Sequence, residues 1–184
     1  WAWNGKLEEQ ELLRQINVLY EMGFGGFFMH SRTGLQTEYL GDDWFRLTDA
    51  CVKKARALGM EPWIYDEDRW PSGCAGGLVT KKPQFRRKYL TLTLNEAADS
   101  SEPPLAVFAA RLDGCSLAPD YRRFDQLQPG ETKLVFRVHT MQPQSVYNGF
   151  TDSDRLSLDA TERFLDVTHR QYAARCAEFS SICG

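Results

Sequence analysis

The pattern of apolar and polar residues repeats twice along the first third of the chain, each time as a helix followed by a strand. In the first round, residues 7–22 carry apolar side chains at the spacing of an amphipathic helix, and Gly23 offers a left-handed C-cap. A short apolar run at residues 24–29 then predicts a buried strand that ends at His30.

The second round repeats this order. Either Asp42 or Asp43 can cap a helix that extends to residue 58, a glycine closes it, and residues 60–65 predict a strand that ends at Asp66. The step from His30 to Asp66 is 36 residues, the length of a helix, a strand and two loops. The pattern therefore predicts βαβα units with parallel strands, preceded by a strand at residues 1–3 with Asn4 at its tip.

The pattern of apolar residues changes after residue 85 and changes again after residue 140, which divides the chain into three parts. Residues 1–85 hold the first βα units. Residues 86–140 are β-rich and broken by turns, with alternation at residues 90–94, which predicts a small antiparallel β insertion. Residues 141–184 return to the first pattern with one long helix at 158–179, which Ser157 or Asp159 can cap.

The fold class that follows is α/β, a partial (β/α) TIM-type barrel with a small antiparallel insertion. A complete barrel needs about 250 residues, so this chain of 184 residues should hold about the first half. We expect such a fragment to be catalytically incomplete by itself. We also expect self-association through exposed half-barrel edges.

Charge and composition limit the classes of binding partner and the cellular location that we expect. A net charge of −3 and the absence of an apolar run of about 18 residues argue against nucleic acid and membrane as partners. No secretory signal follows Trp1. Five cysteines without metal-type spacing favour free thiols and a reducing compartment, so a cytoplasmic location is favoured over secretion.

Polar side chains follow each predicted strand, where parallel α/β folds gather reactive groups. These candidates are Asn4, then His30 with Arg32, then Asp66 with Glu67 and Asp68. Strands must end in something polar, so a single such tip carries little information, but three in succession favour a lined cavity.

The segment from residue 65 to residue 77 carries the most chemistry. Cleavage of a glycosidic bond needs two carboxyl groups, and Asp66 and Glu67 are the catalytic candidates. Asp68 and Trp70 can bind hydroxyls and stack on a sugar ring, as substrate-binding residues beside Asn4, His30 and Arg32. Adjacent carboxylates point in opposite directions along a strand, so a second catalytic group should come from elsewhere. The alternative is that this segment is an acidic, solvated loop without a role in catalysis or binding.

Other interpretations of these residues stay open. His30 can serve as an acid or base or can hold the following loop, and Arg32 can bind a substrate or pair with Asp66 or Glu67. No spacing supports a transition-metal site and no cofactor is certain, although the acidic cluster suits calcium. His169 is expected to face away from any strand tip, on the surface or in interhelix packing. Residues 147–152 are expected to form a turn or to line the cleft.

Four stretches together resemble the amino-terminal barrel of bacterial glycoside hydrolases similar to the family 106 α-L-rhamnosidases. They are residues 1–4 (WAWN), residues 25–35 (GGFFMHSRTGL), residues 39–40 (YL) with 44–45 (WF), and residues 65–77 (YDEDRWPSGCAGG). The resemblance implies a TIM-barrel glycosidase that acts on an oligosaccharide or glycoside, by an inverting mechanism with two glutamates and a bound calcium. Glu67 is one candidate, and the second carboxylate is expected beyond Gly184.

Three functions therefore compete. The first is a glycosidase fragment, with α-L-rhamnosides as one candidate substrate. The second is a non-catalytic carbohydrate-binding domain, and the third is a metal-dependent hydrolase on a TIM barrel.

Overall fold

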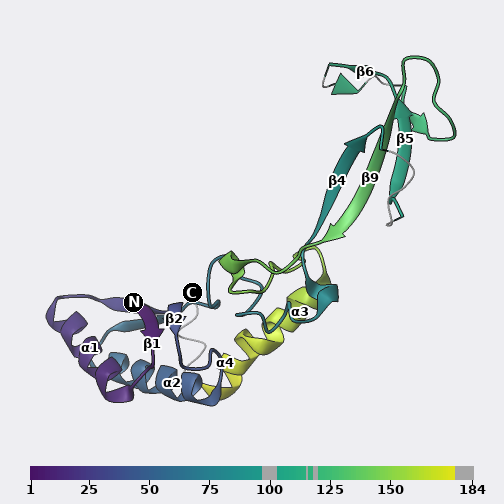
Figure 1. Cartoon of the computed structure of the whole chain (residues 1–184). Helices are drawn as coiled ribbons and strands as arrows, with labels where there is room; N and C mark the ends of the chain where they lie inside the picture. The colour runs from purple at the N-terminus through teal and green to yellow at the C-terminus, as the bar shows by residue number, and fades with distance from the viewer. Residues whose placement is uncertain (97–102, 115, 118–119, 177–184) are drawn as a thin grey trace. The chain divides into compact units, whose positions relative to one another are not determined.

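The structure is a computed structural model that describes residues 1–96, 103–114, 116–117 and 120–176 (Figure 1). The chain forms two compact units. The first consists of residues 1–86 with 142–184, and the second consists of residues 87–141.

A three-stranded parallel sheet forms the centre of the first unit. Its order is β1 (Ala2–Gly5), β2 (Gly26–Leu35) and β3 (Glu61–Ile64), and both neighbouring pairs run parallel. The helices α1 (Glu9–Glu21) and α2 (Asp42–Ala57) connect these strands. The predicted parallel βαβα order is therefore confirmed. The described residues form an open sheet and close no barrel.

The two faces of this sheet differ. Phe27 and Met29 point to the face that packs with Ile16 of α1 and Trp44 of α2, where all four side chains are buried. The opposite face carries rings that contact in pairs across β2 and β3, with Phe28 stacked on Trp63 and His30 tilted against Tyr65. Phe28 is 51% exposed, so among the described residues this second face is less covered at Phe28 than the first face is at Phe27 and Met29.

Glycines end both helices, as the sequence predicts. Gly23 and Gly59 have φ angles of +86° and +70°, a region that residues with a Cβ rarely adopt. The predicted caps at the start of α2 are wrong, because Gly41 occupies the N-cap. Asp42 and Asp43 lie in the first turn, where their charges favour the helix dipole.

β2 does not end at His30, in contrast to the prediction. It continues through Arg32 to Leu35 because β1 goes on pairing with it, from Trp3 opposite Ser31 to Gly5 opposite Leu35. His30 and Arg32 therefore lie within a strand, and the polar residues after His30 belong to the sheet.

The long helix predicted from residue 158 is broken at Thr168. α3 (Leu158–Val167) begins at Ser157, whose hydroxyl accepts a hydrogen bond from the Ala160 N–H, as the sequence predicts. Thr168 has φ −114° and ψ −90°, and its hydroxyl donates to the Phe164 carbonyl at 2.6 Å. α4 (His169–Arg175) follows, and the predicted end at residue 179 lies outside the described residues.

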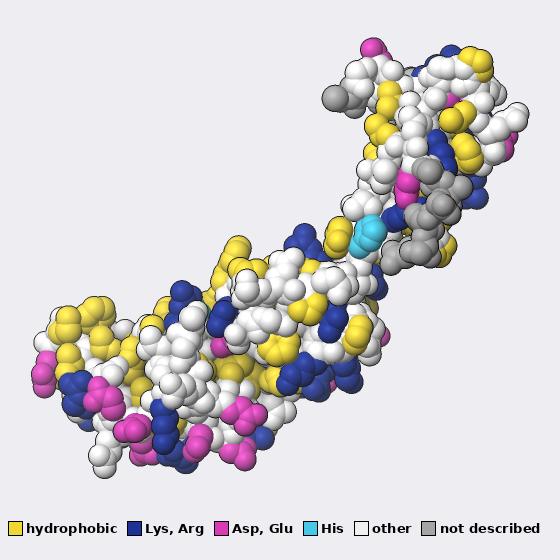
Figure 2. Space-filling model, viewed as in Figure 1, with side chains coloured by type: hydrophobic (Ala, Val, Ile, Leu, Met, Phe, Trp, Pro, Cys, Tyr) yellow, Lys and Arg dark blue, Asp and Glu magenta, His cyan; other side chains and the backbone are white. Residues whose placement is uncertain are grey.

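α4 is tied to α2 by a buried hydrogen bond. The Trp44 indole donates to the Tyr172 hydroxyl at 2.8 Å, and both side chains are at most 1% exposed. The outer surfaces of α1 and α2 carry acidic and basic side chains interspersed (Figure 2), including the ion pair between Arg46 and Glu9. No helix in the described part of the chain is long and apolar enough to span a membrane.

The second unit is an antiparallel sheet in the order β4 (Lys88–Leu94), β9 (Thr132–Thr140), β5 (Ala106–Ala110) and β8 (Arg122–Arg123). A separate pair joins β6 (Leu112–Asp113) and β7 (Ser116–Leu117). The antiparallel strands predicted in the insertion are thus present.

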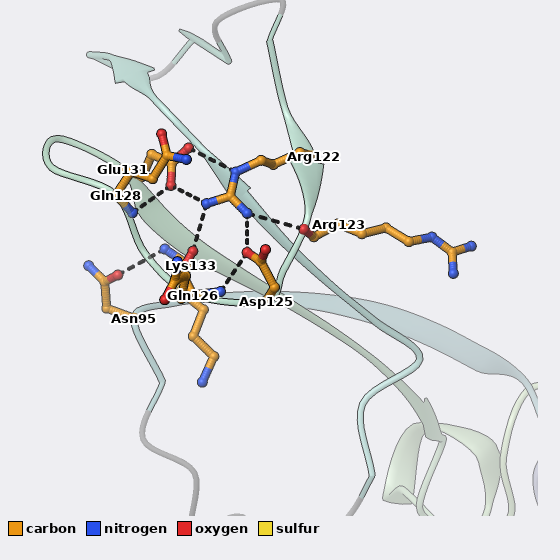
Figure 3. Close-up of polar contacts among 8 residues, drawn as sticks. All are labelled: Asn95, Arg122, Arg123, Asp125, Gln126, Gln128, Glu131 and Lys133. Carbon is orange, nitrogen blue, oxygen red and sulfur yellow. Dashed lines mark hydrogen bonds and ion pairs between the residues drawn. The ribbon is translucent and has the colours of Figure 1, made fainter.

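Arg122 organises one end of this second sheet (Figure 3). Its guanidinium bonds the carboxylates of Asp125 and Glu131, the latter at 2.7 Å, and the carbonyl oxygen of Gln126 at 2.6 Å. These bonds raise the pKa of Arg122 and lower the pKa of Glu131. The cluster closes the loop between β8 and β9 by bonding two carboxylates to one guanidinium.

Candidate functional site

The candidate site lies at the carboxyl end of β3 and is centred on Asp66. The Ser72 hydroxyl donates to Asp66 Oδ1 at 2.6 Å, and His169 Nε2 lies 3.8 Å from Asp66 Oδ2. The Asp66 side chain keeps 34% of its surface exposed. A carboxylate that is oriented by a hydroxyl, flanked by an imidazole and open to solvent can exchange a proton with a ligand.

His169 corrects the expectation that this residue faces away from the strand tips. The break at Thr168 starts a new helix at His169, and the His169 ring reaches Asp66 from the first position of α4. Its Nδ1 lies 3.0 Å from the Thr168 hydroxyl. An unbroken helix gives no reason to place His169 at this site, so the sequence pattern could not identify it.

Glu67 is fully buried, and its carboxylate is bonded to the backbone of its own loop. The N–H groups of Gly73, Cys74 and Ala75 donate to Oε2 at 3.0, 2.9 and 2.7 Å. Those of Gly76 and Asp68 donate to Oε1 at 2.7 and 2.8 Å. Burial raises the pKa of Glu67, although these hydrogen bonds oppose the increase.

This arrangement separates the two catalytic candidates. A carboxylate offers about four lone-pair positions, and five N–H groups already surround that of Glu67. Asp66 is the member of the pair whose oxygens face solvent.

Asp68 is held inside the site. The Ser31 hydroxyl donates to Asp68 Oδ1 at 2.5 Å, and Arg69 Nε lies 3.7 Å from Oδ2. The Arg69 guanidinium also donates to Asn148 Oδ1 at 3.1 Å. Asp68 is only 8% exposed, so it connects β2 to the loop.

Residues 147–155 pack against this loop, and the turn that the sequence predicts lies at residues 148–149. A Cβ on Gly77 would lie 2.4 Å from the Phe150 ring, and one on Gly73 would lie 2.4 Å from the Ser153 hydroxyl. A cavity of about 250 Å³ lies between the loop, residues 153–155 and α3, with Ser72 and Gly73 in its wall. The lining of this cavity includes residues 153–155 and none of residues 147–152, so the alternative that residues 147–152 line the cleft stays a prediction.

The remaining predicted site residues lie on the sheet or at the loop surface. Trp70 is 75% exposed and precedes a cis peptide bond to Pro71. The His30 ring lies against Tyr65 in a tilted arrangement, with ring centroids 3.8 Å apart. Arg32 and Asn4 are exposed, and no ion pair joins Arg32 to Asp66 or Glu67 where the structure describes them. The structure thus brings Asp66 together with Ser72 and His169, and His30 together with Tyr65.

Metal ligands do not gather in this region. Nowhere in the described ranges do three His, Cys, Asp or Glu side chains come close enough to hold a metal ion. The calcium expected from the resemblance therefore has no set of three carboxylate ligands among the described residues.

Comparison with known proteins places the chain in no family. No family model matches it, and no curated protein or solved structure does so. The resemblance to the family 106 α-L-rhamnosidases therefore depends on the four sequence stretches alone.

The pH response of His30 gives a first test of the site's electrostatics. Burial lowers the pKa of His30, and the charge of Arg32 lowers it further. The folded state disfavours the protonated His30 ring. The contribution of His30 to the free energy of unfolding should therefore be fully present above pH 6.5. It should be lost as the pH falls from 6.5 through the lower folded pKa.

Histidine Cε1–H resonances followed by NMR would measure that pKa. Arg32→Gln should raise it towards 6.5, and Arg14→Gln, at an exposed and distant position, should not. A His30 that titrates at or above 6.5 in the unmodified protein would contradict the assignment.

Proposed function

We propose that this chain belongs to the catalytic region of a glycoside hydrolase and that the loop after β3 contacts the sugar. One observation carries the proposal. The part-exposed Asp66 carboxylate lies between the Ser72 hydroxyl and the His169 ring, at the carboxyl end of a parallel strand. This edge is where parallel α/β enzymes gather their reactive groups.

The fold supports the proposal in a specific way. A (β/α) barrel has helices outside its sheet and packed side chains inside it. Here α1 and α2 cover one face, and the aromatic pairs of β2 and β3 occupy the other. The open sheet thus has the layers of the first barrel strands, and we propose that it forms part of a TIM-type barrel.

The chemistry assigns different roles to the neighbouring residues. Asp66 would exchange a proton with the glycosidic oxygen or with water, and His169 would adjust the charge beside it. The exposed Trp70 offers a flat apolar surface to the C–H face of a sugar. Glycosidic cleavage needs a second carboxyl group. We place it outside the described residues, because the Glu67 carboxylate is bonded to the backbone of the loop.

A non-catalytic carbohydrate-binding domain is the second candidate. The exposure of Trp70 favours it, because binding modules use such rings without any acid or base. The two candidates agree that this loop binds sugar and differ over whether Asp66 transfers a proton.

Sugar binding by the chain tests the proposal. Methyl α-L-rhamnopyranoside and a panel of other methyl glycosides would be titrated into the isotope-labelled protein and followed by NMR. We expect shifts at the amides of residues 66–73, and at least tenfold weaker binding in Asp66→Asn and in Trp70→Ala. Asp159→Asn, at an exposed carboxylate in the first turn of α3, is the matched control.

The outcomes separate the candidates. If no glycoside binds, or if both loop variants bind as the unmodified protein does, the sugar site is refuted. Hydrolysis of an aryl glycoside by the unmodified protein that is lost in Asp66→Asn would favour the glycosidase. Binding that depends on Trp70 and not on Asp66 would favour the binding module.

A further inference from the structure

We infer that Glu67 is a positioning residue, the internal anion around which the loop from Asp66 to Gly77 folds. Its role in sugar binding rests on the proposed function, whereas its role in the loop is independent of it. The inference starts from where the five N–H donors lie along the chain.

Four of the donors are consecutive. The N–H groups of residues 73, 74, 75 and 76 all converge on the two oxygens of one carboxylate. Successive N–H groups point to a common centre when residues with left-handed backbone occur among them, and this concave arrangement binds anions. Gly73, Ala75 and Gly76 have φ angles of +132°, +49° and +59°.

Ala75 shows that the loop is held in this conformation. Residues with a Cβ rarely adopt positive φ without compensation, and Ala75 is fully buried. Its N–H makes one of the two shortest bonds to Glu67, at 2.7 Å. The carboxylate therefore provides an interaction that offsets an unfavourable backbone conformation.

In phosphate-binding proteins an arrangement of this kind receives the ligand. Here the chain supplies the anion itself, from six residues before the first of the consecutive donors. The glycine-rich stretch at 73–77 therefore serves the loop's own structure and is closed to an external phosphate.

Glu67 determines where its neighbours point. Ser72 precedes the first donor, Gly73, and the Ser72 hydroxyl holds Asp66. On the other side, the Asp68 N–H donates to Glu67 while its carboxylate accepts from Ser31. One buried carboxylate thus holds the backbone at both ends of the segment from Asp68 to Gly76, and Asp66 keeps a part-exposed side chain.

Replacing the carboxylate tests this role. An amide has one oxygen that can accept and an NH2 group that would oppose the N–H donors, so Glu67→Gln should disrupt the loop. We expect amide exchange at Gly73, Ala75 and Gly76 to accelerate at least tenfold. We also expect a changed carboxyl carbon-13 shift of Asp66. Glu61→Gln, at an exposed position on β3, should change neither.

A small anion should restore what the substitution removes. Glu67→Gly leaves room in the loop, and added formate or acetate should slow the exchange of the same amides and restore the Asp66 shift. Chloride at equal ionic strength should not. A side chain that only fills space would not respond in this way.

A second variant covers the case in which Glu67→Gln does not fold. Ser72→Ala removes only the link to Asp66, so the Asp66 shift should change while the amides bound to Glu67 stay protected. The inference is refuted if anions fail to rescue Glu67→Gly and Ser72→Ala leaves the Asp66 shift unchanged. If the unmodified protein binds no sugar, the proposed function fails, and the exchange and rescue data still decide the role of Glu67.

Discussion

Gly26→Ala is expected to lower the free energy of unfolding of the first unit by about 2–4 kcal/mol. A Cβ at this position would lie 2.3 Å from the backbone carbonyl oxygen of Glu61, closer than any real contact. Gly26 and Glu61 are the first paired residues of β2 and β3. Because the clashing atom is backbone, no rotamer change relieves it, and the two strands must separate.

Gly25→Ala provides the matched control. The neighbouring glycine has no heavy atom within 4 Å of a built Cβ and has no positive φ angle. Its substitution should change the free energy of unfolding by at most about 0.5 kcal/mol. Urea unfolding followed by tryptophan fluorescence measures both, because all five tryptophans lie within residues 1–70 of the first unit. Equal midpoints for the two variants would show that β2 and β3 do not pair in this register.

Trp44→Ala is expected to cost about 3–5 kcal/mol of the same free energy. Trp44 is fully buried, and its ring makes edge contacts with Trp3 and Tyr39 at centroid distances of 5.0 and 4.9 Å. Removal of the indole leaves a cavity between α2 and the sheet. It also leaves the Tyr172 hydroxyl without its donor.

Trp70→Ala makes the same chemical change at an exposed position. Because Trp70 is 75% exposed, its removal should change the free energy of unfolding by at most about 0.5–1 kcal/mol. Thermal unfolding by circular dichroism would compare the two variants. If Trp70→Ala were as destabilising as Trp44→Ala, Trp70 would belong to the core and could not offer its face to a sugar.

Much of the fold follows from hydrophobic periodicity. The spacing of apolar residues predicts α1, α2 and the parallel strands between them, because these elements bury one face against a common core. The length of β2 does not follow from hydrophobic periodicity. Residues 31–35 are mostly polar, and they become strand only because β1 lies beside them. Pairing partners of this kind leave no periodic signal.

The sequence predicts that the acidic loop follows a parallel strand, as the structure shows, and does not predict how its side chains are arranged. Three adjacent carboxylates suggest a reactive or solvated loop, and the sequence offers no way to tell which of them faces inward. The inward position of the Glu67 side chain depends on backbone N–H groups. Every residue except proline carries such a group, so no pattern of side chains reveals which of them converge. The glycines at 73, 76 and 77 were the available signal, since left-handed backbone makes such convergence possible.

His169 illustrates a third limit. Its approach to Asp66 depends on the break at Thr168, and the apolar spacing of residues 158–175 is equally compatible with an unbroken helix. A single backbone angle at one residue therefore decides whether an imidazole lies at the site.

The hydrogen bond between Trp44 and Tyr172 has a consequence for how the chain folds. It joins residues 128 positions apart, so the first unit can complete its core only after a long loop has closed. The second unit lies within that loop, and its ends are bonded to each other, Met141 N–H to the Arg87 carbonyl at 2.8 Å. If the β unit folds first, the loop is shortened by nearly half its length. By loop-closure entropy this assists the final step by only about 0.5 kcal/mol. The insertion thus changes the order of folding events far more than it changes the stability of the product.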